Sequence, residues 1–258
     1  MEEKRVLIAS PTYEGMKYCE EKFIKGLKNI NYQNSEILLI DNSKTKNYFE
    51  HLKKYSGIKV LHNATKEKKN VLRLISSRNI ILEYAKEHNF DYIFMIDSDV
   101  IPPKEILNEL LKCEKGIVTG IYYNLFPQED TYIWFPVAWR ELTNEEFKAI
   151  QDKGLYKGVE KSELRKHLTE TDMNKKDLIE VSIPCGGCML ISKGIFNKTN
   201  YGISKKYFAD DLVYFAFQCK EKGIKMFCNT KMVCEHLLEG KFKKDEKGNL
   251  IHPFYFDE

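Results

Sequence analysis

Short apolar runs alternate with longer amphipathic segments over the first half of the chain. Between the runs, apolar residues recur at helical spacing over residues 16–30 and 71–88. Continuous apolar strands separated by such helices are typical of a mainly parallel sheet covered on both faces. We therefore predict an α/β fold, a first strand that breaks at Pro11, and a short helix opened by Pro102-Pro103. The expected strands are Val6–Ala9, Ile37–Ile40, Lys59–Leu61, Tyr92–Ile96 and Gly116–Thr119.

The pattern changes at about residue 125 and becomes regular again near residue 180. This stretch holds both tryptophans, Trp134 and Trp139, and a charged segment with weak helical periodicity. We interpret it as an insertion, either a lid over the ligand edge of the sheet or a peripheral structural subdomain. The elements expected after it are strands at 180–183, 189–192, 224–227 and 232–234, and a helix over 211–222 closed by Gly223.

Composition narrows the class of protein. The 258 residues are 43% hydrophobic, which is enough for a packed core, and the net charge of +3 does not indicate a nucleic-acid surface. No apolar run reaches membrane-spanning length, and the N-terminus does not resemble a secretion signal. Seven cysteines in such a chain favour reduced thiols. We expect a cytoplasmic protein, and a peripheral association with a membrane surface stays open.

Acidic residues lie where the expected strands end. Asp97-Ser98-Asp99 follows a buried strand directly, and in an extended backbone Asp97 and Asp99 point to the same side. Two carboxylates so placed can share a divalent cation. Pro11-Thr12 and Asp41 end two other strands, and in open α/β sheets ligands bind at the carboxyl ends of strands.

A nucleotide would suit this edge. Asp41 could accept a hydrogen bond from a base, Asp97 could contact ribose or metal, Asp99 could hold a metal on the diphosphate, and Arg78 could bind the diphosphate or the base. Taken alone, Asp41-Asn42-Ser43 is more often a turn with a helix cap, and Arg78 a surface arginine. The hypothesis depends on these residues lying together.

Several segments, in their order and spacing, resemble the motifs of family 2 type GT-A glycosyltransferases. The resemblance covers most of the chain except about 125–180. It implies a single GT-A domain over 1–258, with a nucleotide-binding half at 1–124, the insertion at 125–180 and an acceptor and catalytic half at 181–258. The matching segments are Val6–Tyr13, Asp41–Ser43, Ser77–Asn79, Asp97–Asp99, Gly186-Gly187 before a strand, Ala209–Asp211 opening a helix, and His236.

The resemblance also implies roles for these residues. Asp99 and His236 would bind the metal, Mn²⁺ or Mg²⁺, with Asp97 nearer the ribose or supporting the metal. Asp211 or its neighbour Asp210 would deprotonate the acceptor hydroxyl, and a base opposite the leaving group implies inversion. The family's usual glutamate is Asp210 here, so either acid could be the base. The residues expected to contact the nucleotide sugar are Pro11, Thr12, Tyr13, Asp41, Arg78, Asp97, Ser98, Gly186 and Gly187.

The implied activity is transfer of a sugar from a nucleotide-diphosphate donor, with UDP the first choice and GDP open, to an acceptor hydroxyl on a glycan, lipid-linked or protein acceptor. A nucleotidyltransferase would share the sheet and the acids, but it would carry a glycine-rich basic loop where this chain has Ser10–Gly15. A non-catalytic nucleotide-sugar or glycan-binding module is the other alternative. Cys185-Gly186-Gly187-Cys188 could be a redox pair or half a zinc site, and we favour packing beside a tight glycine turn.

Overall fold

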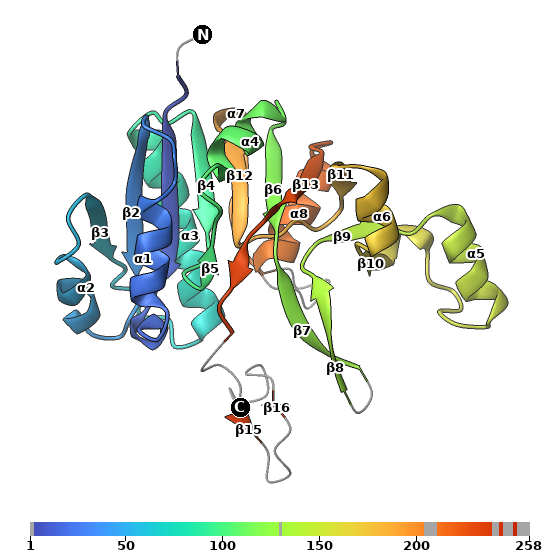
Figure 1. Ribbon diagram of the computed structural model, residues 1–258. Coiled ribbons are helices and arrows are strands. Elements are labelled where there is room, and N and C mark those ends of the chain that lie inside the picture. The colour runs from blue at the N-terminus through green and yellow to red at the C-terminus, as the bar shows by residue number, and fades with distance from the viewer. Residues whose placement is uncertain (1–2, 129–130, 204–210, 239–242, 245–249, 252–258) are drawn as a thin grey trace.

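Eight strands form one sheet in the computed structural model, which describes residues 3–128, 131–203, 211–238, 243–244 and 250–251 (Figure 1). The strand order is β11-β13-β6-β12-β4-β1-β2-β3. In that order the strands span Leu178–Val181, Met226–Val233, Ile117–Ile121, Cys188–Ser192, Tyr92–Ile96, Val6–Thr12, Ser35–Asp41 and Ile58–His62.

Most of these strands run in the same direction. β3, β2, β1 and β4 are paired in parallel, β12 runs antiparallel to both β4 and β6, and β13 is parallel to β6. Only β12 and β11 therefore oppose the other six, which confirms the predicted mainly parallel α/β sheet. The carboxyl ends of β1, β2, β4, β6 and β13, and the amino end of β12, consequently share one edge.

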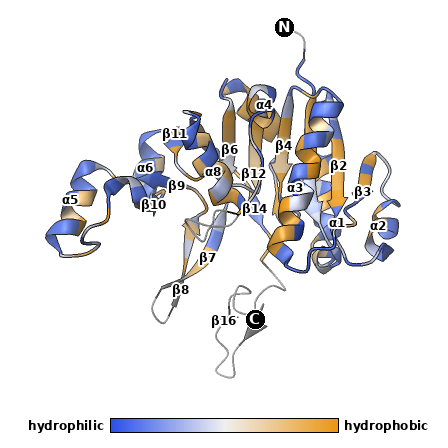
Figure 2. Ribbon diagram, turned by 180° about the vertical axis from the view of Figure 1, so that it is seen from behind, coloured by the Kyte–Doolittle hydropathy of each residue, from blue (hydrophilic) through white to orange (hydrophobic). Residues whose placement is uncertain are grey.

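Helices cover both faces of the sheet. In the half of the sheet formed by β1 to β4, α1 lies on one face and α3 lies on the other, as the two opposite views show (Figures 1 and 2). Phe23 and Leu27 of α1 and Ile81 and Ala85 of α3 are buried against the strands. The helices associated with the sheet are α1 Glu20–Lys28, α2 Asn47–Leu52, α3 Asn70–Glu87, α4 Ile106–Lys112, α7 Lys193–Phe196 and α8 Asp211–Glu221, with a 3₁₀ turn, η1, at Glu14–Met16.

Several elements begin or end a few residues away from the sequence prediction, and the differences at β1, α4 and β13 have a visible structural cause. β1 continues through Pro11 to Thr12, because β4 pairs with it only as far as Ala9 and the proline interrupts no bond to that neighbour. α4 begins at Ile106, after a turn closed by the bond from the Ile106 N–H to the Pro103 carbonyl. The two short strands expected at 224–227 and 232–234 form one strand, β13, whose register shifts between Cys228 and Val233.

The described residues between 123 and 175 add no strand to the main sheet. Figure 1 shows them as a hairpin, a two-stranded ribbon and two helices that extend below and beside it. Arg140 joins three of these pieces, because it pairs with Glu146 at 2.6 Å and with Asp172 at 2.9 Å. The elements are β7 Tyr123–Gln128, β8 Thr131–Pro136, β9 Trp139–Glu141, α5 Asn144–Asp152, η2 Lys161–Glu163, β10 Arg165–His167 and α6 Glu170–Lys175.

Two small strand pairs complete the fold. β5, Val100–Ile101, pairs antiparallel with β14, Glu235–His236, and this pairing was not predicted from the sequence. β15, Lys243–Lys244, pairs with β16, Leu250–Ile251. Within the described ranges, no helix combines the length and the apolar character needed to span a bilayer.

Candidate active site

Asp99 and His236 face each other at the edge where the parallel strands end. The β5–β14 pairing brings them together, because His236 lies opposite Val100 and the Leu237 N–H donates to the Asp99 carbonyl at 2.8 Å. His236 Nε2 lies 3.6 Å from Asp99 Oδ2, and both side chains are about nine-tenths buried. This distance is too long for a hydrogen bond.

The protonation of His236 suits a metal ligand. Its Nδ1 donates to the Tyr123 carbonyl at 3.0 Å, so in the neutral ring Nε2 carries the lone pair that is directed toward Asp99. Burial lowers the pKa of His236 and favours this neutral form. The second nitrogen of a metal-binding histidine is commonly held by a carbonyl in this way.

The ligand atoms and their spacing decide whether a metal ion fits this pair. Among the described residues, no group of three histidine, cysteine, aspartate or glutamate side chains could hold a metal ion. A site that also uses substrate phosphates needs fewer protein ligands, and Mg²⁺ is commonly bound by one or two carboxylates plus phosphate. Two ligands each about 2.1 Å from one ion lie roughly 3–4 Å apart. The 3.6 Å between Asp99 and His236 is compatible with that arrangement.

Asp97 contacts a different set of groups. Its Oδ1 accepts a hydrogen bond from Arg78 Nη2 at 2.8 Å. The Asp97 N–H also donates to the Gly187 carbonyl at 3.1 Å, and a Cβ atom added to Gly187 would lie 2.6 Å from Asp97 Oδ2. The two acids of the Asp97-Ser98-Asp99 motif are therefore separated: Asp99 lies beside His236, and Asp97 lies beside Arg78 and the glycine turn.

Arg78 links this edge to the start of α8. Its Nη1 donates to Asp211 Oδ2 at 2.6 Å, and its guanidinium lies 5.3 Å from the centre of the Tyr201 ring. Burial acts against the charge, but the carboxylates of Asp211 and Asp97 outweigh it and raise the pKa of Arg78 above its ordinary value. Nothing in the sequence pattern indicated Tyr201, because its neighbours match none of the motifs.

Asp41 lies at the predicted edge, but it is fully buried. Its Oδ1 accepts bonds from the backbone N–H and the hydroxyl of Ser43, and its Oδ2 lies 3.0 Å from His62 Nδ1. The turn that Asp41-Asn42-Ser43 is expected to form even without a ligand role is thus present. Contact between Asp41 and a nucleotide base stays a prediction. It requires the base to bind a carboxylate that already contacts Ser43 and His62.

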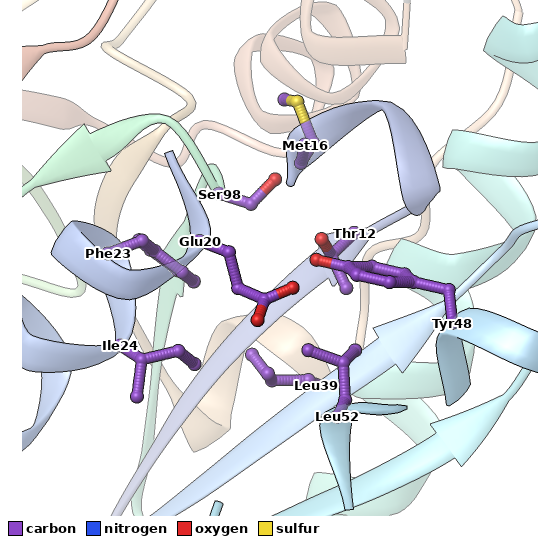
Figure 3. Close-up of a pocket in the computed structure, with 9 residues that line it drawn as sticks. All are labelled: Thr12, Met16, Glu20, Phe23, Ile24, Leu39, Tyr48, Leu52 and Ser98. Carbon is purple, nitrogen blue, oxygen red and sulfur yellow. The ribbon is translucent and has the colours of Figure 1, made fainter. Parts of the chain in front are cut away.

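Thr12 and Ser98 face a closed space beside the sheet (Figure 3). Glu20 and Tyr48 line the same space, which has no room for a water molecule. Pro11 and Thr12 are buried at the end of β1, whereas Tyr13 is 41% exposed. Of these predicted nucleotide contacts, Tyr13 is therefore the one whose side chain is open to a ligand.

The glycine turn before β12 is packed against the acidic edge. A Cβ atom on Gly186 would lie 2.8 Å from Leu212 Cδ1, so both glycines allow close approach. The flanking Cys185 and Cys188 are buried and free, and Cys185 Sγ contacts the Val137 carbonyl at 2.8 Å. Packing beside the glycine turn stays our interpretation of these two cysteines. Asp210, the alternative base, lies outside the described residues.

The α/β sheet of this topology matches the GT-A fold of glycosyltransferases. Residues 11–199 match the family described as Glycosyl transferase family 2. The chain belongs to glycosyl transferase family 2.

Solved structures share the fold at low sequence identity. GalNAc-T7, solved with UDP, GalNAc and Mn²⁺, has a TM-score of 0.62 at 15% identity over 91% of this chain. The mannosyltransferase PcManGT from Pyrobaculum calidifontis, in complex with GDP-Man and Mn²⁺, has a TM-score of 0.55 at 12% identity over 93% of this chain. A curated relative, the procollagen-lysine,2-oxoglutarate 5-dioxygenase of Drosophila melanogaster, is 23% identical over 84% of this chain.

All three relatives are longer proteins. The chain spans 28% of the Drosophila protein, 44% of GalNAc-T7 and 59% of the mannosyltransferase. The likeness to the two solved structures establishes the fold of this chain. It does not assign the activities of those longer proteins to this chain.

Proposed function

We propose that the chain transfers a sugar from a nucleotide-diphosphate donor to an acceptor hydroxyl, in a metal-dependent reaction that inverts the anomeric carbon. The observation that carries this proposal is the pairing of Asp99 with His236 across 3.6 Å at the edge where Arg78 also holds Asp97 and Asp211. A ligand set and a candidate base thus lie at the ligand-binding edge of a GT-A sheet.

Asp99 and His236 would hold Mn²⁺, or Mg²⁺ in its place, since mixed oxygen and imidazole ligands suit Mn²⁺. When bound, the ion would neutralise the diphosphate as a Lewis acid. Both solved neighbours contain Mn²⁺ with a nucleotide or nucleotide sugar, which supports this choice. Asp97, held by Arg78 next to Gly187, would be on the ribose side of the donor.

Asp211 is our choice for the general base. It would accept the proton of the acceptor hydroxyl while the hydroxyl oxygen bonds to the anomeric carbon and the bond to the diphosphate breaks. Arg78 Nη1 donates to Asp211 Oδ2 at 2.6 Å and so holds this carboxylate in place at the start of α8. Asp210 stays the alternative.

UDP is the first choice of nucleotide, because Asp41 occupies the position that the resemblance assigns to a uracil contact. One structural neighbour contains UDP and another GDP-Man, so GDP is the second choice. Family membership argues against a nucleotidyltransferase, and the retained acids argue against a non-catalytic binding module. We also infer a reducing location such as the cytoplasm, because all seven cysteines are free.

A thermal-shift panel of UDP-sugars and GDP-sugars, with and without Mn²⁺, tests the proposal. A ligand present at about 100 times its Kd stabilises the folded state by roughly 2.7 kcal/mol. We expect a shift that requires both the nucleotide sugar and Mn²⁺, and its loss in Asp99→Ala. The control Asp152→Ala removes an exposed aspartate of α5 and should keep the shift.

Turnover of isotope-labelled donor then separates enzyme from binding module. Hydrolysis or transfer that depends on Mn²⁺ supports the enzyme, and binding without any turnover contradicts it. Full activity in Asp99→Ala would overturn the metal assignment.

A further inference from the structure

A cavity of about 570 Å³ lies among the residues between β6 and β11. Its walls come from the β7–β8 hairpin, the β9–β10 ribbon and the start of α6, which lie together in Figure 1. Ligand pockets in proteins commonly enclose roughly 300–1,000 Å³, so the cavity has the size of a binding site. Neither the proposed donor site nor the family motifs use it.

Aromatic rings form much of the wall. Trp134, Phe135 and Trp139 all line the cavity. His167 packs between two of them, with its ring centre 4.0 Å from that of Trp139 and 5.0 Å from that of Phe135. Trp134 remains 54% exposed, so its packing within the chain is incomplete. An exposed indole beside an ordered aromatic wall provides a flat apolar surface for a ring-shaped ligand.

The polar groups of the cavity indicate a neutral ligand. Lys166 pairs with Glu146 at 3.0 Å, and Arg165 lies 3.7 Å from Glu141 and donates to the backbone carbonyls of Ser162 and Leu164. Both lining cations are therefore already bound to groups of this chain. Among the lining residues that the structure describes, a phosphate or carboxylate would find no uncompensated cation, whereas hydroxyl groups could bond to the polar atoms of the wall.

The cavity also adjoins the proposed metal site. Tyr123 lines it, and the carbonyl of Tyr123 accepts the bond from His236 Nδ1 at 3.0 Å. The preceding residue, Tyr122, packs against the His236 ring with 5.0 Å between ring centres. A molecule in the cavity is thus separated from a metal-binding histidine by one residue of β7.

We propose that this cavity binds a neutral saccharide unit of the acceptor, with Trp134 stacked on a sugar ring. This inference extends the proposed function. The identification of the bound saccharide as the acceptor rests on that function. Flat aromatic walls, paired cations, a suitable volume and the contact through Tyr123 are the observations that carry it.

Tryptophan fluorescence offers a direct test, because the chain has two tryptophans and both line the cavity. Wild-type protein is titrated with neutral mono- and disaccharides, namely glucose, galactose, mannose, N-acetylglucosamine, lactose and cellobiose. We expect a saturable change with at least one of them. Trp134→Ala should weaken that binding about tenfold, as judged by saccharide-induced thermal shift.

Tyr156→Ala is the matched control, since Tyr156 is similarly exposed at 57% but does not line the cavity. It should bind saccharides as the wild type does. Glucose 6-phosphate and decanol are the competing probes, for an anionic and an apolar ligand. Tighter binding of either one than of every neutral saccharide would overturn the proposal, and so would unchanged saccharide affinity in Trp134→Ala.

Donor binding is measured separately, by the Mn²⁺-dependent shift with nucleotide sugars. If the donor binds and no saccharide changes the fluorescence, this inference fails and the proposed function stands. If saccharides bind in the cavity and no nucleotide sugar binds with Mn²⁺, the proposed function fails and the saccharide site stands without its acceptor role.

Discussion

Arg78 Nη1 donates a hydrogen bond of 2.6 Å to Asp211 Oδ2, a residue 133 positions further along the chain. Both side chains are about 95% buried, and the second guanidinium nitrogen holds Asp97 at 2.8 Å. One buried cation therefore connects α3, the end of β4 and the start of α8. Asp97, which we propose lies on the ribose side of the donor, and Asp211, the proposed base, are positioned by the same arginine.

Replacing Arg78 by methionine should lower the free energy of unfolding by about 3–5 kcal/mol, because the substitution removes one member of a buried ion pair. Urea unfolding measures the change. Arg78→Met/Asp211→Asn should recover part of the loss, since the second substitution removes the buried charge. Lys112→Met, which breaks an exposed pair with Glu109, should leave the midpoint unchanged. Additive effects in the double variant would show that the pair is not coupled.

Asp211→Asn should keep donor binding and reduce transfer by about 10²–10⁴-fold, the range that general bases contribute. The amide oxygen can still accept a bond from Arg78, so the start of α8 should stay in place. Asp210→Asn is the matched neighbour and should retain most of the activity. If Asp210→Asn is instead the variant that binds donor and fails to transfer, the base is Asp210.

Gly187→Ala should weaken donor binding about tenfold while the protein stays folded. The added methyl group would lie 2.6 Å from Asp97 Oδ2 and 3.0 Å from the Tyr122 hydroxyl, so the Asp97 carboxylate must move. Gly194→Ala is the control, because a Cβ there meets nothing within 4 Å. Calorimetric titration of nucleotide sugar with Mn²⁺ compares the two. Equal affinity in both variants would mean that the position of Asp97 does not matter to the donor.

Central strands such as β4 and β12 could be predicted from the sequence because each is a continuous apolar run that is almost entirely buried. Tyr92–Ile96 was delimited to the residue for this reason, and the position of Asp97 at its end followed. The ends of β1 and β13 could not be predicted. The end of β1 depends on where β4 stops pairing with it, and the extent of β13 depends on a shift of register against β6. Neither cause is visible in the sequence of the strand itself.

The strand ends predicted only the acids of the candidate site, and the family resemblance added Arg78, Asp211 and His236. The sequence placed Asp41, Asp97 and Asp99 on one edge, because parallel strands bring their carboxyl ends together. It could not reveal that Arg78 binds Asp97 and Asp211, or that β14 pairs with β5 and presents His236 to Asp99. These are contacts between distant segments, and they depend on the packed fold.

Glu146 should make the free energy of unfolding depend on pH in the acidic range. Arg140 donates to both of its carboxylate oxygens, at 2.6 and 2.8 Å, and this bond holds the pKa of Glu146 well below its usual value of about 4.3. A carboxyl group whose pKa is lowered in the folded state stabilises the fold at pH values above its ordinary pKa. This stabilisation is lost progressively as the pH falls below the ordinary pKa. Glu146→Gln should therefore be less stable than the wild type at pH 7, and the difference should shrink toward pH 3.

Tryptophan fluorescence during urea unfolding measures this difference in stability, because Trp134 and Trp139 lie on β8 and β9. Glu163→Gln, at an exposed position of η2, should show no such convergence, and a constant difference for Glu146→Gln would contradict the ion-pair explanation.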